Sequence, residues 1–231
     1  MKKWIMVFLL TLLLPFHFSV LLANQSSSHE NIPLSSAKGS TLFIRSYLPK
    51  SFWPLALQFL TQSNTNNCSI ASSVMVLNAL KIRPPGEPTV TQSNFFSPAV
   101  EKILPMQSVS RQGSTLDQIS HALATWPVHV TIIHANTISL DQFRHTVIQT
   151  LRRSDRYMIV NYYRPVLHQQ GKGHMSPIAA YDKRSDRVLI MDVTRYRYPP
   201  VWVKTSDLWH AMRTMDALAH ASRGFLVVQK E

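Results

Sequence analysis

Residues 61–81 read TQSNTNNCSIASSVMVLNALK, a polar loop followed by an apolar segment. Apolar side chains at positions 70, 74, 77 and 80 have helical spacing, which predicts a helix over 69–81. Cys68, the only cysteine of the chain, therefore stands at the N-terminus of this helix. The positive end of a helix dipole lowers the pKa of a thiol and makes it more reactive. The pattern indicates that Cys68 is a nucleophile, and the alternative is a buried, inert cysteine.

A cysteine nucleophile needs a base that takes its proton and a further group that orients the base. His174 opens the predicted strand Ser176–Tyr181, and Asp192 lies within the predicted strand Val188–Val193. A hairpin centred on residue 183 or 184 would bring His174 opposite Asp192, or one diagonal place away, on the same face. We therefore expect a Cys–His–Asp triad, although Asp192 taken alone also fits a turn or cap residue.

Gln62 precedes Cys68 by six residues. Its side-chain amide is a candidate oxyanion donor, together with the backbone N–H of Cys68. Spacing alone leaves open that Gln62 is an ordinary polar loop residue.

The remaining elements predict an α+β fold, because helices come mostly first and strands mostly later. Capping boxes at Ser114-x-x-Asp117 and Ser139-x-x-Gln142 predict two helix starts. A last helix is expected over Ser206–Leu218. Three more predicted strands are short and β-branched or aromatic: Val128–His134, Tyr157–Tyr163 and Phe225–Gln229.

The N-terminus predicts export. Residues 1–23 carry a basic head, an apolar core and a small residue near the end, which is typical of a secretory signal peptide. An uncleaved anchor is the alternative. Residues 24–40 are polar and predict a flexible lead-in, and 41–231 a single catalytic domain. We expect a periplasmic or secreted protein that has no stable membrane insertion once the leader is removed.

Composition limits the class of protein. The chain has 231 residues, of which 45% are hydrophobic and 16% charged, as in a globular domain. The net charge is +12, and +10 without Lys2 and Lys3 of the leader. Because the basic residues are scattered, we expect a basic surface that attracts acidic substrates and no nucleic-acid partner. A single cysteine excludes an intramolecular disulfide and a structural thiolate metal site, and we predict no metal ligands.

Five blocks resemble the phytochelatin synthase family, in the family's order, over nearly the whole chain from about residue 40. The first block is Gln62 with Cys68–Leu80, which resembles the family's nucleophile helix. The other four are Arg111–Leu116 (RQGSTL), Gly173–Pro177 (GHMSP), Asp192–Tyr196 (DVTRY) and Tyr198–Trp202 (YPPVW).

The resemblance implies a papain-like fold in which a helical part that carries the nucleophile packs against an antiparallel sheet. It implies a triad of Cys68, His174 and Asp192, with Gln62 at the oxyanion hole. Arg164 and Arg223 match family positions that resemble contacts to the substrate carboxylates; without the resemblance, either fits a surface charge.

The implied activity is that of a glutathione γ-glutamylcysteinyltransferase-like cysteine enzyme. Such an enzyme removes glycine from glutathione through a γ-glutamylcysteinyl thioester on Cys68. It passes the acyl group to water or to a second glutathione, and we expect hydrolysis to γ-glutamylcysteine to dominate. No cofactor is required, and a divalent heavy metal would stimulate as a metal–glutathione thiolate. A homodimer is left open.

Two departures stand out: Ser69 replaces the glycine that commonly follows the family's cysteine, and no cysteine-rich C-terminal region is present. Two rival functions remain. One is a papain-like peptidase acting on longer peptides. The other is a non-enzymatic basic envelope-binding or metal-binding module that uses some of the ten histidines.

Overall fold

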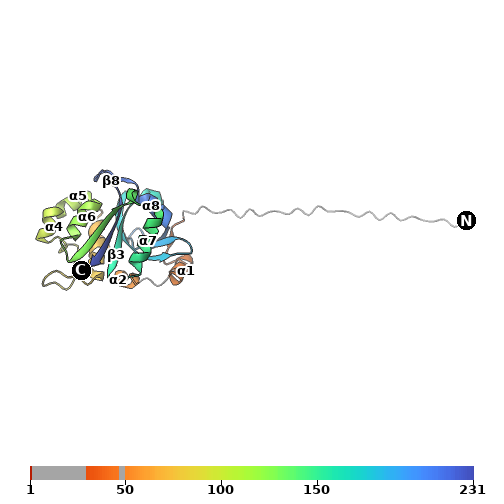
Figure 1. The fold of residues 1–231 in the computed structure, drawn as a ribbon, viewed down its shortest axis with the longest axis horizontal. Helices are drawn as coiled ribbons and strands as arrows, with labels where there is room; N and C mark the ends of the chain where they lie inside the picture. Colours follow the sequence, from red (N-terminus) through yellow and green to blue (C-terminus); the bar gives the residue numbers. More distant parts are fainter. Residues whose placement is uncertain (2–29, 47–49) are drawn as a thin grey trace.

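A seven-stranded antiparallel sheet forms the centre of the molecule (Figure 1), in the order β1-β6-β5-β4-β3-β9-β2. The computed structural model describes residues 1, 30–46 and 50–231. The predicted signal peptide and residues 24–29 of the predicted lead-in lie outside these residues. The strands of this sheet are β1 Ile32–Pro33, β2 Val128–His134, β3 Arg156–Tyr163, β4 Gly173–Asp182, β5 Arg187–Ile190, β6 Val201–Lys204 and β9 Gly224–Lys230.

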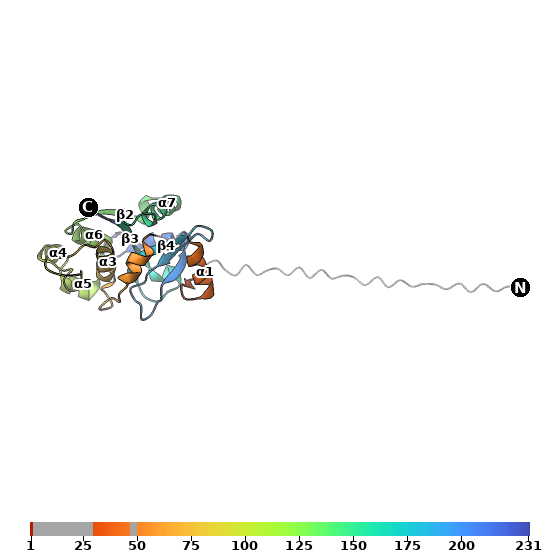
Figure 2. The same cartoon turned by 90° about the horizontal axis from the view of Figure 1, so that it is seen from below.

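The helices lie on both faces of the sheet. Figure 1 shows α4, α5 and α6 on one side and α7 and α8 on the other, and Figure 2 shows α3 beside α4–α6. None of the helices within the described residues is long and apolar enough to cross a membrane. The bounds are α1 Ala37–Arg45, α2 Phe52–Leu57, α3 Cys68–Ala79, α4 Pro98–Ile103, α5 Met106–Gln112, α6 Leu116–Leu123, α7 Leu140–Leu151 and α8 Thr205–Met212.

Two hydrophobic cores follow from the alternation of side chains along the strands. On β3, Tyr157 and Ile159 face the core that contains α3 and α6, whereas Met158 and Val160 face the core of α7 and α8. All four side chains are fully buried. The sheet is thus covered on both faces, and the predicted α+β class is confirmed.

Several predicted boundaries are corrected. Residues 24–40 were predicted to be a flexible lead-in. However, Ile32–Pro33 pairs with β6 and α1 begins at Ala37, so part of this segment belongs to the fold. The α6 capping box is Thr115/Gln118 and not Ser114/Asp117, whereas the Ser139/Gln142 box of α7 is confirmed.

The last helix, α8, ends at Met212, before the predicted Leu218, because β7 (Met215–Asp216) pairs with β8 (Ala221–Ser222).

Candidate active site

The nucleophile helix α3 begins at Cys68, one residue earlier than predicted, and packs against β4. Ser72 of α3 donates a hydrogen bond to the carbonyl oxygen of Met175 on β4 at 3.1 Å. Cys68 as a whole residue is half-buried. The N-cap residue, Asn67, makes no side-chain capping bond with any residue that the structure describes. The first backbone N–H groups of α3 therefore remain available to a developing anion.

Ser69, the position that departs from the family glycine, has a specific partner. Ser114 donates a hydrogen bond from its Oγ to the Oγ of Ser69 at 2.7 Å. This bond joins the loop before α6 to the start of α3, directly beside Cys68.

The thiol of Cys68 and the imidazole of His174 are electrostatically coupled. Burial alone would raise the pKa of Cys68, but the charge and hydrogen bond of His174 outweigh it, and the pKa of the thiol is lowered. Burial alone would lower the pKa of His174, yet the charges of Asp192 and Cys68 raise it. Opposite shifts of this kind favour a thiolate–imidazolium pair.

His174 contacts Asp192 through the ring nitrogen Nε2. Nε2 lies 3.0 Å from Oδ1 of Asp192 and 2.9 Å from Oγ of Ser176. Because Nε2 is engaged in this way, Nδ1 is the ring nitrogen that remains for a proton from the thiol of Cys68. His174 and Asp192 are nearly inaccessible to solvent, at 5% and 0% exposed.

The β4–β5 hairpin explains how these two residues meet. Ile178 pairs with Ile190, so the position opposite Asp192 belongs to Ser176, and His174 lies one diagonal place further along. Asp192 itself follows β5, which ends at Ile190 and not at the predicted Val193.

Asp192 accepts hydrogen bonds from three residues besides the imidazole. The hydroxyl of Tyr162 donates to Oδ2 at 3.2 Å, and the backbone N–H of Thr194 donates to Oδ1 at 2.8 Å. Arg164 contacts both oxygens at 2.9 Å. Although burial would raise the pKa of Asp192, the positive charge and hydrogen bonds of His174 and Arg164 hold it well below its usual range. The carboxyl is therefore a fixed negative charge behind the imidazole.

Arg164, which the resemblance assigned to a substrate carboxylate, is only 4% exposed. Its Nη1 also donates to Oε1 of Gln169 at 2.6 Å, and its Nη2 to Oγ1 of Thr194 at 3.1 Å. The ring of Tyr198 covers its guanidinium, with the ring centroid 4.5 Å away. The structure thus gives Arg164 the carboxylate of Asp192 as its anionic partner.

Gln62 links the nucleophile loop to the segment after β5. Its Nε2 donates to the backbone oxygens of Asn64 at 2.7 Å and Thr65 at 2.9 Å. Its Oε1 accepts from the hydroxyl of Thr194 at 3.0 Å, and its backbone N–H donates to Val193 O at 3.0 Å. Both amide protons are engaged within the loop in this conformation, so a role at the oxyanion requires the side chain to turn.

Arg223 lies beside the histidine, over Gly173. A Cβ at Gly173 would meet the guanidinium, so any larger residue there requires the Arg223 side chain to move. The Nη1 of Arg223 donates to Asp216 at 2.8 Å and to Asn161 at 3.1 Å. Its Nε is buried and has no hydrogen-bond partner among the described residues. Arg223 thus keeps unused donor capacity at the edge of the site.

Three residues of this site escaped sequence reasoning: Tyr162, Ser176 and Thr194. All point toward Asp192 or His174 from strand β3, from strand β4 or from the turn after β5. Only Ser176 carried a local signal, because a buried serine two residues from a strand histidine shares its face. Within the described residues, no group of three His, Cys, Asp or Glu side chains could hold a metal ion.

Comparison with known proteins gives consistent results. Residues 23–225 match the family model described as phytochelatin synthase. Glutathione gamma-glutamylcysteinyltransferase 3 of Lotus japonicus is 34% identical over 202 residues, 86% of this chain and 42% of the relative. The Arabidopsis thaliana protein numbered 2 under the same name is 32% identical over 212 residues, 90% of this chain and 47% of its own.

A protein of Schizosaccharomyces pombe with the same name is 24% identical over 201 residues, 86% of this chain and 49% of its own. The chain spans less than half the length of these curated relatives.

Proposed function

The chain belongs to the phytochelatin synthase family, and from that premise we propose that it is a thiol acyltransferase that removes glycine from glutathione. The single observation that carries the proposal is the buried His174–Asp192 pair, with Nε2 3.0 Å from Oδ1, electrostatically coupled to the thiol of Cys68. It supplies a nucleophile, a base and an orienting carboxylate, as acyl transfer through a thioester requires.

The first half-reaction forms the acyl-enzyme. The thiol proton of Cys68 moves to Nδ1 of His174, and the thiolate attacks the carbonyl carbon of the cysteinyl–glycine bond. The negative charge that develops on the carbonyl oxygen is stabilised by the backbone N–H of Cys68 at the uncapped end of α3. The imidazolium returns its proton to the glycine nitrogen as the C–N bond breaks, and γ-glutamylcysteine remains as a thioester.

The second half-reaction regenerates the thiol. His174 takes a proton from a water molecule, whose oxygen attacks the thioester carbonyl. The C–S bond breaks, the proton returns to the sulfur, and γ-glutamylcysteine leaves. When the amino group of a second glutathione replaces water, the same steps lengthen the peptide by one γ-glutamylcysteine unit. We expect hydrolysis to dominate.

Arg223 is the residue we assign to a substrate carboxylate. Its partly unused guanidinium next to His174 supports this role, because glutathione carries two carboxylates and a guanidinium binds a carboxylate through two parallel hydrogen bonds. We do not extend the assignment to Arg164, which contacts both oxygens of Asp192. Arg223 also pairs with Asp216, but its Nε is left without a partner among the described residues.

No step written above uses a cofactor. A divalent heavy metal would enter with the substrate, as the thiolate complex of glutathione. The signal-peptide pattern of residues 1–23 supports export to the periplasm or the medium. Fractionation of producing cells tests the location, and cytoplasmic recovery of the intact chain would contradict it.

The decisive experiment follows free glycine while the reduced protein is incubated with glutathione. We expect one glycine per γ-glutamylcysteine, no release by Cys68→Ala, and an adduct on Cys68 that is lighter than glutathione by one glycine. A longer α-linked peptide without a γ-glutamyl group serves as the control substrate. Cleavage of that peptide in place of glutathione would favour a general peptidase.

A further inference from the structure

Helices α1 and α2 expose large apolar side chains on one face of the molecule. The side chains of Ile44, Trp53 and Leu57 are 81%, 62% and 79% exposed. Trp53 and Leu57 are four residues apart, so they share one side of α2. We call this the α1–α2 face and define it by these three side chains and the groove beside them.

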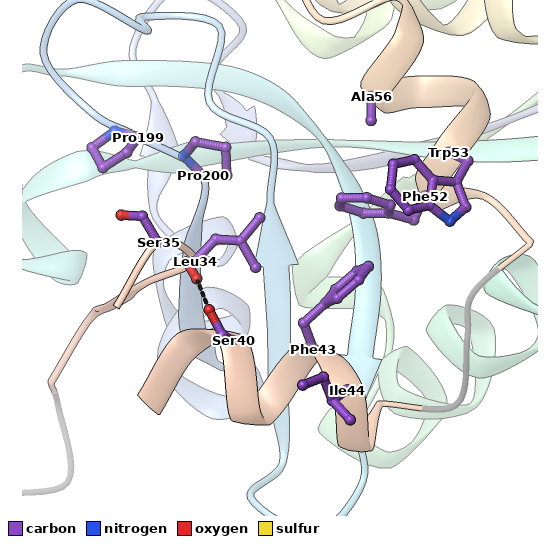
Figure 3. Close-up of a pocket in the computed structure, with 10 residues that line it drawn as sticks. All are labelled: Leu34, Ser35, Ser40, Phe43, Ile44, Phe52, Trp53, Ala56, Pro199 and Pro200. Atoms are coloured by element: carbon purple, nitrogen blue, oxygen red, sulfur yellow. Dashed lines mark hydrogen bonds between the residues drawn. The ribbon is translucent and has the colours of Figure 1, made fainter. Parts of the chain in front are cut away.

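An apolar groove of about 480 Å³ lies between α1, α2 and the turn at Pro199-Pro200 (Figure 3). Phe43 of α1 and Phe52 of α2 meet in it, with ring centroids 4.3 Å apart. Cys68, His174 and Asp192 are not among the residues that line it. The α1–α2 face is therefore separate from the candidate active site.

Basic residues outnumber acidic ones in the segments that form the α1–α2 face, although Lys38 and Arg45 of α1 pair with Glu30 and Asp182. Residues 31–86 contain no aspartate or glutamate. Lys50 stands next to the start of α2, and Arg195 and Arg197 precede the Pro199-Pro200 turn; all three are exposed. Exposed apolar side chains together with lysine and arginine are typical of surfaces that bind anionic lipids.

The N-terminal chain also enters the fold at this face. Leu34 lines the groove. The segment Trp4–Ala23, whose apolar run is Trp4–Leu14, ends seven residues before Glu30. Seven extended residues span at most about 25 Å. Whenever that segment lies in a bilayer, before or without cleavage, Glu30 therefore lies no more than about 25 Å from it, close enough for the α1–α2 face to reach the lipid headgroups.

We propose that the α1–α2 face docks on the surface of an anionic lipid bilayer. Trp53, Leu57 and Ile44 enter the boundary between headgroups and acyl chains, while the surrounding basic side chains contact lipid phosphates. A second copy of the chain fits this face less well, because a twofold interface would bring the same positive charges together. The docking is peripheral and leaves the fold intact.

The test uses the full chain with vesicles of phosphatidylcholine, with and without phosphatidylglycerol. We expect tighter binding to the anionic vesicles that weakens as salt is added. The double variant Trp53→Ser/Leu57→Ser should bind them at least about tenfold less tightly, since binding scales with the apolar area that leaves water. The matched control, Ile103→Ser/Met215→Ser, removes two side chains that are 42% and 65% exposed elsewhere and should bind like the parent.

All these proteins carry the same N-terminal segment, so its contribution cancels in the comparison. A second measurement isolates Trp53. Its fluorescence, obtained as the difference between the parent and Trp53→Phe, should be quenched by lipids brominated near the headgroups. Thermal unfolding of each variant shows that the fold is kept. Equal vesicle binding by both double variants, with unquenched Trp53 emission, would overturn the proposal. So would a dimer in solution that only Trp53→Ser/Leu57→Ser dissociates while vesicle binding persists.

Discussion

Arg164 and Asp192 form a buried, two-point ion pair, with Nη1–Oδ2 and Nη2–Oδ1 distances of 2.9 Å. The same carboxylate lies 3.0 Å from the imidazole of His174. A cation, an anion and an imidazole are thus aligned behind the thiol. The charge of Arg164 helps to keep Asp192 ionised, and the charge of Asp192 favours the protonated form of His174. Both effects have measurable consequences.

Replacement of Arg164 should impair catalysis and stability more than substrate binding. Arg164→Met leaves the charge of Asp192 buried with fewer partners, which typically costs about 3 to 5 kcal/mol of unfolding free energy. We expect kcat for glycine release to fall while KM for glutathione stays within about twofold, because the lost interaction does not involve substrate. Urea unfolding and steady-state kinetics measure both quantities. A large rise in KM with unchanged kcat would instead return Arg164 to the substrate site.

The pH profile of kcat/KM should be broad. The pKa of Cys68 is lowered, so activity should rise with pH below the value of about 8.5 at which a free thiol ionises. The pKa of His174 is raised, so activity should fall only above about 6.5, the value of a free imidazole. Asp192→Asn removes the negative charge that raises the pKa of His174 and should move the alkaline limb to lower pH. An unmoved alkaline limb would show that Asp192 does not control the imidazole.

Ser176→Ala should lower kcat by about tenfold with little change in KM. The change removes one of the two groups that Nε2 of His174 contacts, and it also removes the acceptor of the Val193 N–H at 3.3 Å. Loss of a buried hydrogen-bond partner costs about 1 to 3 kcal/mol of stability. Ser176→Thr keeps the hydroxyl and serves as the matched control. Equal kcat values for the alanine variant and the parent would exclude a positioning role.

Two variants test whether Gln62 acts at the oxyanion, because they separate its amide N–H donors from its oxygen acceptor. Gln62→Glu keeps an oxygen for the Thr194 hydroxyl but loses both amide donors, whereas Gln62→Ala loses everything. If the side chain turns to the oxyanion during the reaction, both variants should lose about 10²-fold in kcat or more. If it only fastens the loop, both variants should lower the unfolding free energy and leave kcat of the folded protein near that of the parent. Kinetics at a temperature at which both variants are folded separate the two results.

Arg223→Met should raise KM for glutathione and leave kcat within a few-fold. The expected loss is about 1.5 to 3 kcal/mol, the net value of a charge-assisted hydrogen bond, or about tenfold or more in kcat/KM. Two glutathione monoesters, each esterified on a different carboxylate, identify which carboxylate Arg223 binds. For the ester of that carboxylate, kcat/KM should be the same for Arg223→Met and for the parent, because the contact is already lost. Equal penalties on glutathione and both esters would assign Arg223 a structural role through Asp216.

Local sequence patterns predicted the parts of this site that depend on neighbours along the chain. The helix after Cys68 follows from the apolar spacing at positions 70, 74, 77 and 80, and the start of α7 from its capping box. The diagonal relation of His174 and Asp192 was among the arrangements expected from a single hairpin, but the register also shifts between Ile178 and Ala180, and the turn alone does not predict that shift.

Other features depend on contacts between segments far apart and could not be predicted in this way. Arg164 meets Asp192 across 28 residues, and Gln62 meets Thr194 across 132. Residues 32–33 look like a polar lead-in because a two-residue edge strand has no periodicity, yet they pair with β6. The α6 cap shifted by one residue because Ser114 is used by Ser69 and Thr115 takes the cap.

The thiol is carried by α3 and its base by β4, two elements joined across the core by Ser72 and Met175. The reactive pair therefore exists only while the helical layer is in register with the sheet, and a small sideways slip separates the two without melting either. On heating, the glycine-releasing activity should accordingly be lost a few degrees below the temperature at which circular dichroism detects any loss of helix. Activity is then a more sensitive measure of the packing between the helical layer and the sheet than helix content is.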